Sequence, residues 1–127
     1  MREEAKYKAA LMRELRDRLP GFVCQRIEDR FTSGWPDVEV IGCGRTSYWE
    51  VKCADPAWKS HGIQELTMLR LAASSFHARY IFFREKKGIK QTMIVHPNDL
   101  ENLLPEAWTA GFDQRWLVEH IRKVHQA

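Results

Sequence analysis

The sequence predicts an α/β fold in which a mixed central β-sheet is flanked by helices. Apolar residues recur at helical spacing near the N-terminus and again in the middle of the chain. Between and after these stretches, several short runs alternate apolar and polar residues, as strands do. These patterns leave the order of the strands open.

The length and composition indicate one soluble domain. At 127 residues the chain has room for one domain with a core and hardly for two, so we expect a single domain over 1–127. A net charge of only +3 excludes a polybasic tail, so any nucleic-acid surface must be a local patch. No apolar run approaches membrane-spanning length, and we expect no membrane partner.

The cysteines indicate the compartment. Cys24, Cys43 and Cys53 show no Cys-x-x-Cys spacing, which argues against a zinc site or an iron–sulfur cluster. An odd count without a signal peptide is typical of a reducing environment, so we expect a cytoplasmic protein.

Residues 2–19 are expected to form an amphipathic helix that ends at Pro20-Gly21. Its apolar stripe has helical spacing and consists of Tyr7, Leu11, Leu15 and Leu19. Glu4 falls near the middle of this stripe, where a carboxylate is costly unless it is paired or bound to a metal. Glu4 can equally belong to a solvated first turn, where the helix dipole favours acids.

The run 22–28 is expected to be a short strand, followed by a loop over 31–35 that leads toward Asp37. Arg26, on the polar face of this strand, can reach a phosphate or pair with a neighbouring carboxylate. Trp35, in the loop, can stack on a base or sugar, or can anchor the loop in the core.

Two further strands, 37–41 and 47–53, are expected to pair antiparallel through a glycine-containing turn. Side chains alternate faces along a strand, so Glu50 and Lys52 share one face. The pairing would place Asp37 near Glu50. Two adjacent carboxylates raise each other's pKa unless a cation lies between them, and oxygen ligands suit Mg²⁺ or Mn²⁺. Lys52 would orient a water or stabilise charge on a phosphate.

These motifs also have ordinary interpretations. A Glu-x-Lys triplet is common on a solvated strand face, where it forms a weak ion pair, and Pro36-Asp37 is a common turn step. Their order, their spacing and the strand context distinguish the combination from either motif alone.

The segment 54–62 follows directly and combines aromatic and basic residues, which favours contact with a substrate backbone. It contains Lys59 and His61; the histidine can be an acid or base, a phosphate contact, or an exposed loop residue without a role.

A helix is expected at 63–76, with Gln64 in its first turn facing the candidate site strands. Strands are then expected at 79–83 and 91–95, and helices at 99–104 and 113–125. His120 and His125 of the last helix are five positions apart, which is poor spacing for chelation on one helix face, so we assign no metal site there.

The motifs Gly34-x-Pro36-Asp37 and Trp49-Glu50-Val51-Lys52, with a following helix that carries Gln64, resemble the PD-(D/E)xK nuclease superfamily. Within it the chain is most similar to small stand-alone virus-type replication-repair (VRR-NUC) nucleases and related phage endonucleases. The resemblance covers about 4–83. It implies a restriction-endonuclease-like core over about 4–96, with a C-terminal helical extension over about 98–127.

The resemblance implies a DNA endonuclease that hydrolyses phosphodiester bonds with Mg²⁺ or Mn²⁺. Asp37 and Glu50 would bind the metal together with the Val51 carbonyl. Lys52 would lie beside the attacking water, and Gln64 would support the site.

Related nucleases carry an acid on the first helix that completes the metal site. Glu4 is the expected residue here, because Glu4-Ala-Lys-Tyr resembles their opening, and Glu14 is the alternative. Some relatives cut branched DNA such as Holliday junctions, for which a symmetric homodimer would present two sites. A bacterial or phage-infected cytoplasm is the expected setting.

Two other functions remain open at this point. One is a DNA-binding module on the same fold that does not cut. The other is an interaction or assembly protein in which the same residues form an ion-pair network.

Overall fold

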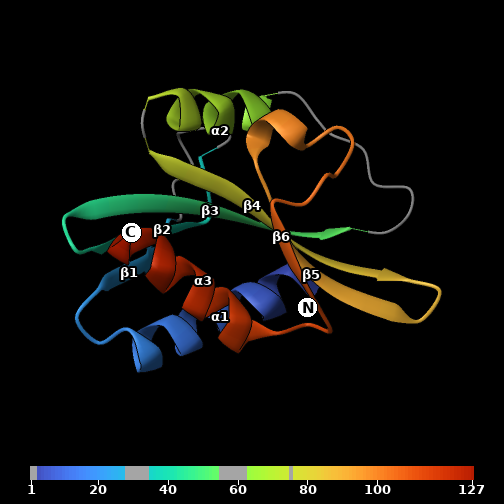
Figure 1. Ribbon diagram of the computed structural model, residues 1–127, viewed down its shortest axis with the longest axis horizontal. Coiled ribbons are helices and arrows are strands. Elements are labelled where there is room, and N and C mark those ends of the chain that lie inside the picture. Colours follow the sequence, from blue (N-terminus) through green and yellow to red (C-terminus); the bar gives the residue numbers. More distant parts are fainter. Residues whose placement is uncertain (1–2, 28–34, 55–62, 75) are drawn as a thin grey trace.

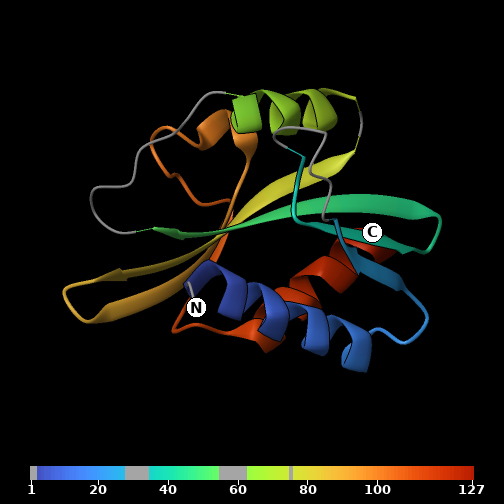
Figure 2. The same cartoon turned by 180° about the vertical axis from the view of Figure 1, so that it is seen from behind.

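A computed structural model of the protein describes residues 3–27, 35–54, 63–74 and 76–127. Within these residues, helices α1 (Glu3–Arg18) and α3 (Gln114–Gln126) lie on one face of a mixed β-sheet, and α2 (Ile63–Ala73) lies on the other (Figures 1 and 2). The predicted α/β class is confirmed. No helix of the described part of the chain is long and apolar enough to cross a membrane.

The sheet has six strands in the order β1-β2-β3-β4-β5-β6. They are β1 (Val23–Arg26), β2 (Val38–Gly42), β3 (Arg45–Ala54), β4 (His77–Lys86), β5 (Ile89–Val95) and β6 (Ala107–Ala110). Neighbouring strands are antiparallel except β3 and β4, which are parallel. Parallel neighbours need a crossover connection, and α2 supplies it.

The alternation of side chains along β3 divides the core into two layers. Trp49 and Val51 are fully buried on the face covered by α1 and α3. Tyr48 lies on the opposite face with the core residues that pack beneath α2. The predicted stripe of α1 contributes to the first layer, which confirms its amphipathic character: Leu11, Leu15 and Leu19 are buried and Tyr7 packs against them.

The turn between β2 and β3 has two residues, Cys43 and Gly44, because Gly42 and Arg45 form the last pair of the ladder. Both turn residues have positive φ, 54° and 74°, as a type I′ turn requires. The predicted antiparallel hairpin is confirmed. This turn type matches the twist of the flanking strands and therefore fixes which residues of β2 and β3 face each other.

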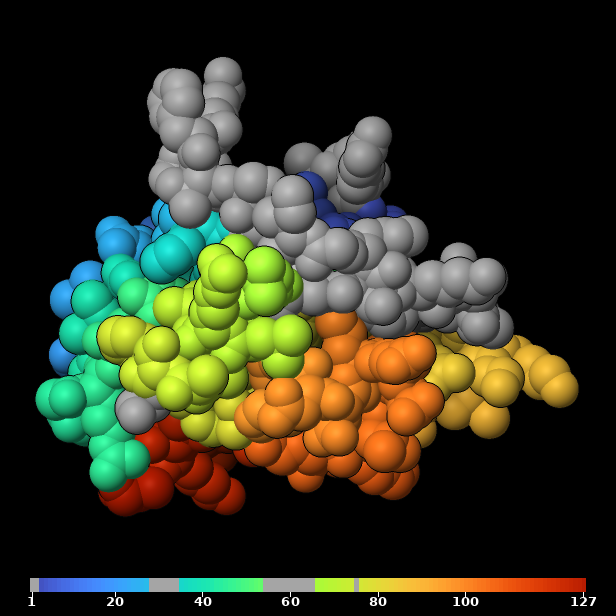
Figure 3. Space-filling view, turned by 90° about the horizontal axis from the view of Figure 1, so that it is seen from above, coloured from blue at the N-terminus to red at the C-terminus, as the bar shows by residue number. Residues whose placement is uncertain are grey.

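The C-terminal part differs from the sequence prediction. The helix predicted at 99–104 is wrong, because the chain forms only a 3₁₀ turn, η1 (Pro97–Asp99), which lies beside α2 (Figure 3). The region expected to be a helical extension also contains β6, which pairs with β5. Four residues of a sheet-edge strand are too short to give a periodic signal. The last helix is confirmed, with Asp113 as its N-cap.

We expect Gly44→Ala to lower the free energy of unfolding by about 1 kcal/mol, because an L side chain is strained at φ 74°. Chemical denaturation measures this change. Gly21→Ala is the matched control: an added Cβ there meets no atom within 4 Å and the residue lacks a positive φ. An equal loss in both variants would contradict the role of the turn.

Candidate functional site

Asp37 lies where β2 begins and β3 continues past it. The outermost pair of this ladder is Val38 with Trp49, so Asp37 and Glu50 are the next residues along the two strands. The backbone N–H of Val51 donates a hydrogen bond to Asp37 Oδ2 at 2.9 Å. The structure therefore brings Asp37 next to the Glu50 segment, as the sequence predicts.

Each of these two carboxylates has a lysine beside it. Lys8 of α1 donates to Asp37 Oδ1 at 2.8 Å, and both side chains are 18% exposed. Lys52 Nζ lies 3.3 Å from Glu50 Oε2, with the lysine 20% exposed. Lys8 was not identified from the sequence. Its position next to Tyr7, at the border of the apolar stripe, is the only signal that could have found it.

Glu50 is buried, with 2% of its side chain exposed. Burial, followed by the negative charge of Asp37, raises the pKa of Glu50 to about 8, although Lys52 and Lys8 act in the opposite direction. The two lysines therefore do not compensate fully for desolvation and carboxylate repulsion. An additional cation at this position would stabilise the ionised form of Glu50.

The Val51 carbonyl lies on the same side of β3 as Asp37. In an extended strand, the N–H and C=O of one residue point to the same side. Because the Val51 N–H points to Asp37, the Val51 carbonyl oxygen faces that side as well. β2 does not extend that far, because its first residue, Val38, pairs with Trp49.

Two arginines lie near these groups. Arg26 is exposed and pairs in register with Val38, so it lies at the same edge as Asp37. Arg84, which was not identified from the sequence, is on β4. Its register partner is Ala54, two residues beyond Lys52 and on the same face of β3, and its side chain is half-buried. Both positions suit contact with a phosphate.

Trp35 packs against the core, which is one of the two roles that the sequence left open for it. Its ring meets Tyr48 edge-on with 5.8 Å between centroids, and it packs against the core beneath α2. The side chain is half-buried. Trp35 therefore anchors the start of the β2 segment.

The structure does not join Glu4 or Glu14 to the carboxylate pair. Glu4 lines a cavity of about 320 Å³ together with Glu3, Lys8 and Cys53. Glu14 accepts a hydrogen bond from Arg18 at 2.5 Å, near the other end of α1. Over the described residues, no group of three or more His, Cys, Asp or Glu side chains is placed to hold a metal ion.

Three predicted site residues cannot be placed. Lys59 and His61 lie outside the described residues. The backbone of Gln64 is in the first turn of α2, but its side chain is outside the described part of the chain.

The donor set fits a hard divalent cation. It consists of the carboxylates of Asp37 and Glu50 and the carbonyl of Val51, and oxygen donors of this kind suit Mg²⁺ and Mn²⁺.

No protein-family model matches the chain, and no curated protein matches it. The functional assignment therefore depends on the geometry and electrostatics of the residues themselves.

We expect the free energy of unfolding to fall as pH rises from about 4.5 to about 8. Over this range folded Glu50 keeps a proton that the unfolded chain releases near its ordinary pKa of 4.5. Glu50 can contribute up to about 1.4 kcal/mol per pH unit in that window. Urea denaturation without divalent metal measures the slope.

Glu50→Gln should flatten this slope and be more stable than the wild type at pH 8. Glu101→Gln, at an exposed position, is the matched control and should keep the wild-type slope. An unchanged slope in Glu50→Gln would show that the Glu50 carboxyl is not the titrating group.

Proposed function

We propose that this protein is a divalent-metal-dependent DNA endonuclease with a restriction-endonuclease-like core. The observation that carries the proposal is the adjacency of Asp37 to the buried Glu50, with Lys52 3.3 Å from Glu50. Two carboxylates and an amine at this spacing have a charge distribution suited to hydrolysis of a phosphodiester.

Asp37, Glu50 and the Val51 carbonyl would hold Mg²⁺ or Mn²⁺. When bound, the metal supplies Lewis acidity toward the phosphate and lowers the pKa of water. In this arrangement Glu50 would be ionised, and the ammonium group of Lys52, 3.3 Å from Glu50 Oε2, would hold the attacking water. Asp37 keeps its hydrogen bond from the Val51 N–H, which orients its carboxylate.

The phosphodiester is itself an anion and repels an approaching hydroxide. Positive groups near the attacked phosphate are therefore needed, and Lys52 and Arg84 lie on the same sheet face. Arg26 at the neighbouring edge would contact the DNA backbone. Such contacts position the strand without reading its sequence. Preference for branched DNA and a symmetric homodimer are further parts of the proposal, and they rest on the resemblance alone.

One observation favours a second function, a DNA-binding module that does not cut. Lys8 already donates to Asp37 at 2.8 Å, so a lysine occupies one oxygen that a metal would need. If Lys8 neutralises Asp37 permanently, the site would contact DNA without hydrolysing it. Metal binding separates the two functions.

We expect metal-dependent cleavage of labelled DNA in the presence of Mg²⁺ or Mn²⁺, and none with EDTA. Linear double-stranded, single-stranded and four-way-junction substrates should be compared. Asp37→Asn and Lys52→Ala should each lower the cleavage rate by about 10²- to 10³-fold, because each removes a charge from the reacting centre.

Lys123→Ala, an exposed lysine on α3, is the control for Lys52→Ala and should cut at the wild-type rate. Circular dichroism should show that all variants are folded. A folded wild-type protein that binds DNA but cuts none of the three substrates would sink the nuclease proposal and favour the non-cleaving module.

We expect the affinity for Mn²⁺ to rise about tenfold per pH unit between pH 6 and pH 8, because the metal must displace the proton of Glu50. Isothermal titration calorimetry measures the affinity and the proton release. Glu50→Gln should bind Mn²⁺ weakly at every pH, whereas Glu101→Gln should follow the wild type. A pH-independent affinity would contradict this assignment.

A further inference from the structure

A second cavity of about 570 Å³ lies at the other end of the sheet, where β3 and β4 begin. Its wall includes Arg45, Arg79 and three histidines: His77, His96 and His125. No Asp or Glu of the described residues lines it. The candidate nuclease residues Asp37, Glu50 and Lys52 are not part of this wall, so the cavity has a separate chemistry. Its lining favours an anionic ligand.

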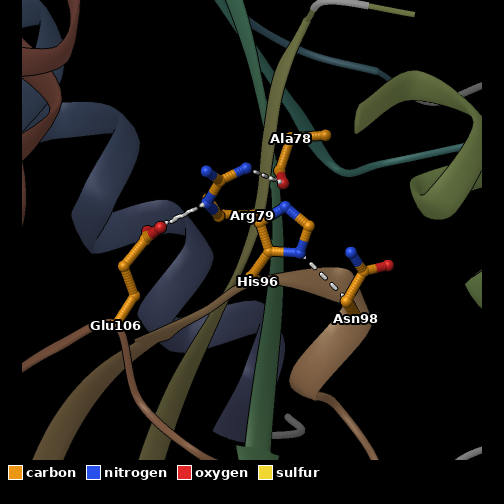
Figure 4. Close-up of polar contacts among 5 residues, drawn as sticks. All are labelled: Ala78, Arg79, His96, Asn98 and Glu106. Atoms are coloured by element: carbon orange, nitrogen blue, oxygen red, sulfur yellow. Dashed lines mark hydrogen bonds and ion pairs between the residues drawn. The ribbon is translucent and has the colours of Figure 1, made fainter. Parts of the chain in front are cut away.

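Arg79 is held rigidly in this wall. Its Nε donates to both carboxylate oxygens of Glu106, at 2.9 and 3.2 Å, and one Nη donates to the Ala78 carbonyl at 3.0 Å (Figure 4). A guanidinium carries five N–H donors in a fixed plane, so this arrangement fixes its orientation and leaves other donors for a ligand. Glu106 offsets part of the charge of Arg79 from outside the cavity lining.

His96 presents a donor beside Arg79. The Nδ1 atom of His96 accepts a hydrogen bond from the backbone N–H of Asn98 at 3.0 Å. The remaining ring proton is therefore on Nε2, and Figure 4 shows the imidazole ring next to the Arg79 guanidinium. The cap of η1 thus selects the tautomer in which His96 can donate to an anion.

The floor of the cavity is held by a polar network. His125 is 1% exposed, and its Nδ1 donates to the Gly42 carbonyl at 2.9 Å, while its Nε2 lies 2.7 Å from Ser47 Oγ. Trp49 Nε1 donates to the same hydroxyl at 2.8 Å. These bonds fix the position of the wall, so Ser47 and His125 are positioning residues.

His77 has an unused polar atom. Its Nε2 is buried and has no hydrogen-bond partner among the described residues. Leaving such an atom unsatisfied costs free energy, which a bound hydrogen-bonding ligand can recover. Burial and the charge of Arg79 lower the pKa of His77 to about 4, so this ring is neutral at pH 7.

An aromatic ring stands at the same cavity. Phe76 is 40% exposed and lines the wall together with Ala72. Exposed phenylalanine rings offer a stacking face for a planar group. The cavity volume is within the range of about 300–1,000 Å³ that small-molecule sites have.

We propose that this cavity binds a phosphate monoester joined to an aromatic base, which is the chemistry of a mononucleotide. Arg45, Arg79 and His96 contact the phosphate, and Phe76 contacts the base. The ligand is either a free nucleotide or the terminal phosphate of a DNA strand. The inference does not depend on the proposed nuclease activity, because none of these residues belongs to that site.

Isothermal titration calorimetry with the full chain tests the proposal, using AMP, adenosine, inorganic phosphate and a short oligonucleotide with or without a 5′-phosphate. AMP should bind at least about tenfold more tightly than adenosine, because adenosine lacks the charge-assisted hydrogen bonds. Inorganic phosphate should bind more weakly than AMP. Tighter binding of the 5′-phosphorylated oligonucleotide than of AMP would assign the ligand to a strand end, and the reverse order to a free nucleotide.

Arg45→Gln should weaken AMP binding about tenfold, because it removes a phosphate contact at an exposed position. Arg13→Gln, at an exposed position on α1 outside the cavity, is its matched control and should bind like the wild type. Phe76→Leu should weaken AMP but leave inorganic phosphate unchanged.

The histidine resonances give a readout at the site itself. Bound phosphate should shift the signals of His77 and His96 and raise the pKa of His77. Glu106 already acts in this direction, whereas the charges of Arg79, His120 and His125 lower the pKa of His77. Absence of saturable AMP binding at millimolar concentration, or binding that Arg45→Gln and Arg13→Gln affect equally, would overturn the proposal.

Discussion

The pairing of β2 with β3 determines the position of every group in the candidate site. A slip of one residue would turn Glu50 and Lys52 to the face covered by α1 and α3 and would turn Trp49 and Val51 away from that apolar core. The type I′ turn at Cys43 and Gly44 prevents that slip. The site therefore depends on a turn at the far end of the hairpin, which contributes no reacting group.

The register also explains why a costly group is buried. Glu50 shares its sheet face with the core beneath α2, so its carboxylate loses hydration while Asp37 adds repulsion. Lys52 and Lys8 offset part of this cost. Because the pKa of Glu50 remains raised, a further cation beside its carboxylate would stabilise the ionised form.

The sequence was most informative where residues act locally. Helical spacing predicted α1, and alternation with two turn glycines predicted the hairpin that joins Asp37 to Glu50. Long-range partners were not predictable: Lys8 reaches Asp37 across 29 residues, and Arg84 joins the site only through the parallel β3–β4 register. The sequence could not show that β6 completes the sheet. β6 has only four residues, too few for a periodic signal, and it is defined by its pairing with β5.

The two ends of β3 have different polar surroundings. At one end lie the carboxylates of Asp37 and Glu50 with Lys8 and Lys52 beside them, whereas Arg45, His77 and Arg79 line a cavity at the other end that contains no Asp or Glu among the described residues. Ser47 and Lys52 are five residues apart, which corresponds to about 16 Å along a strand. The proposed cation site and the proposed phosphate site share no residue, so loss of binding at one need not accompany loss of binding at the other.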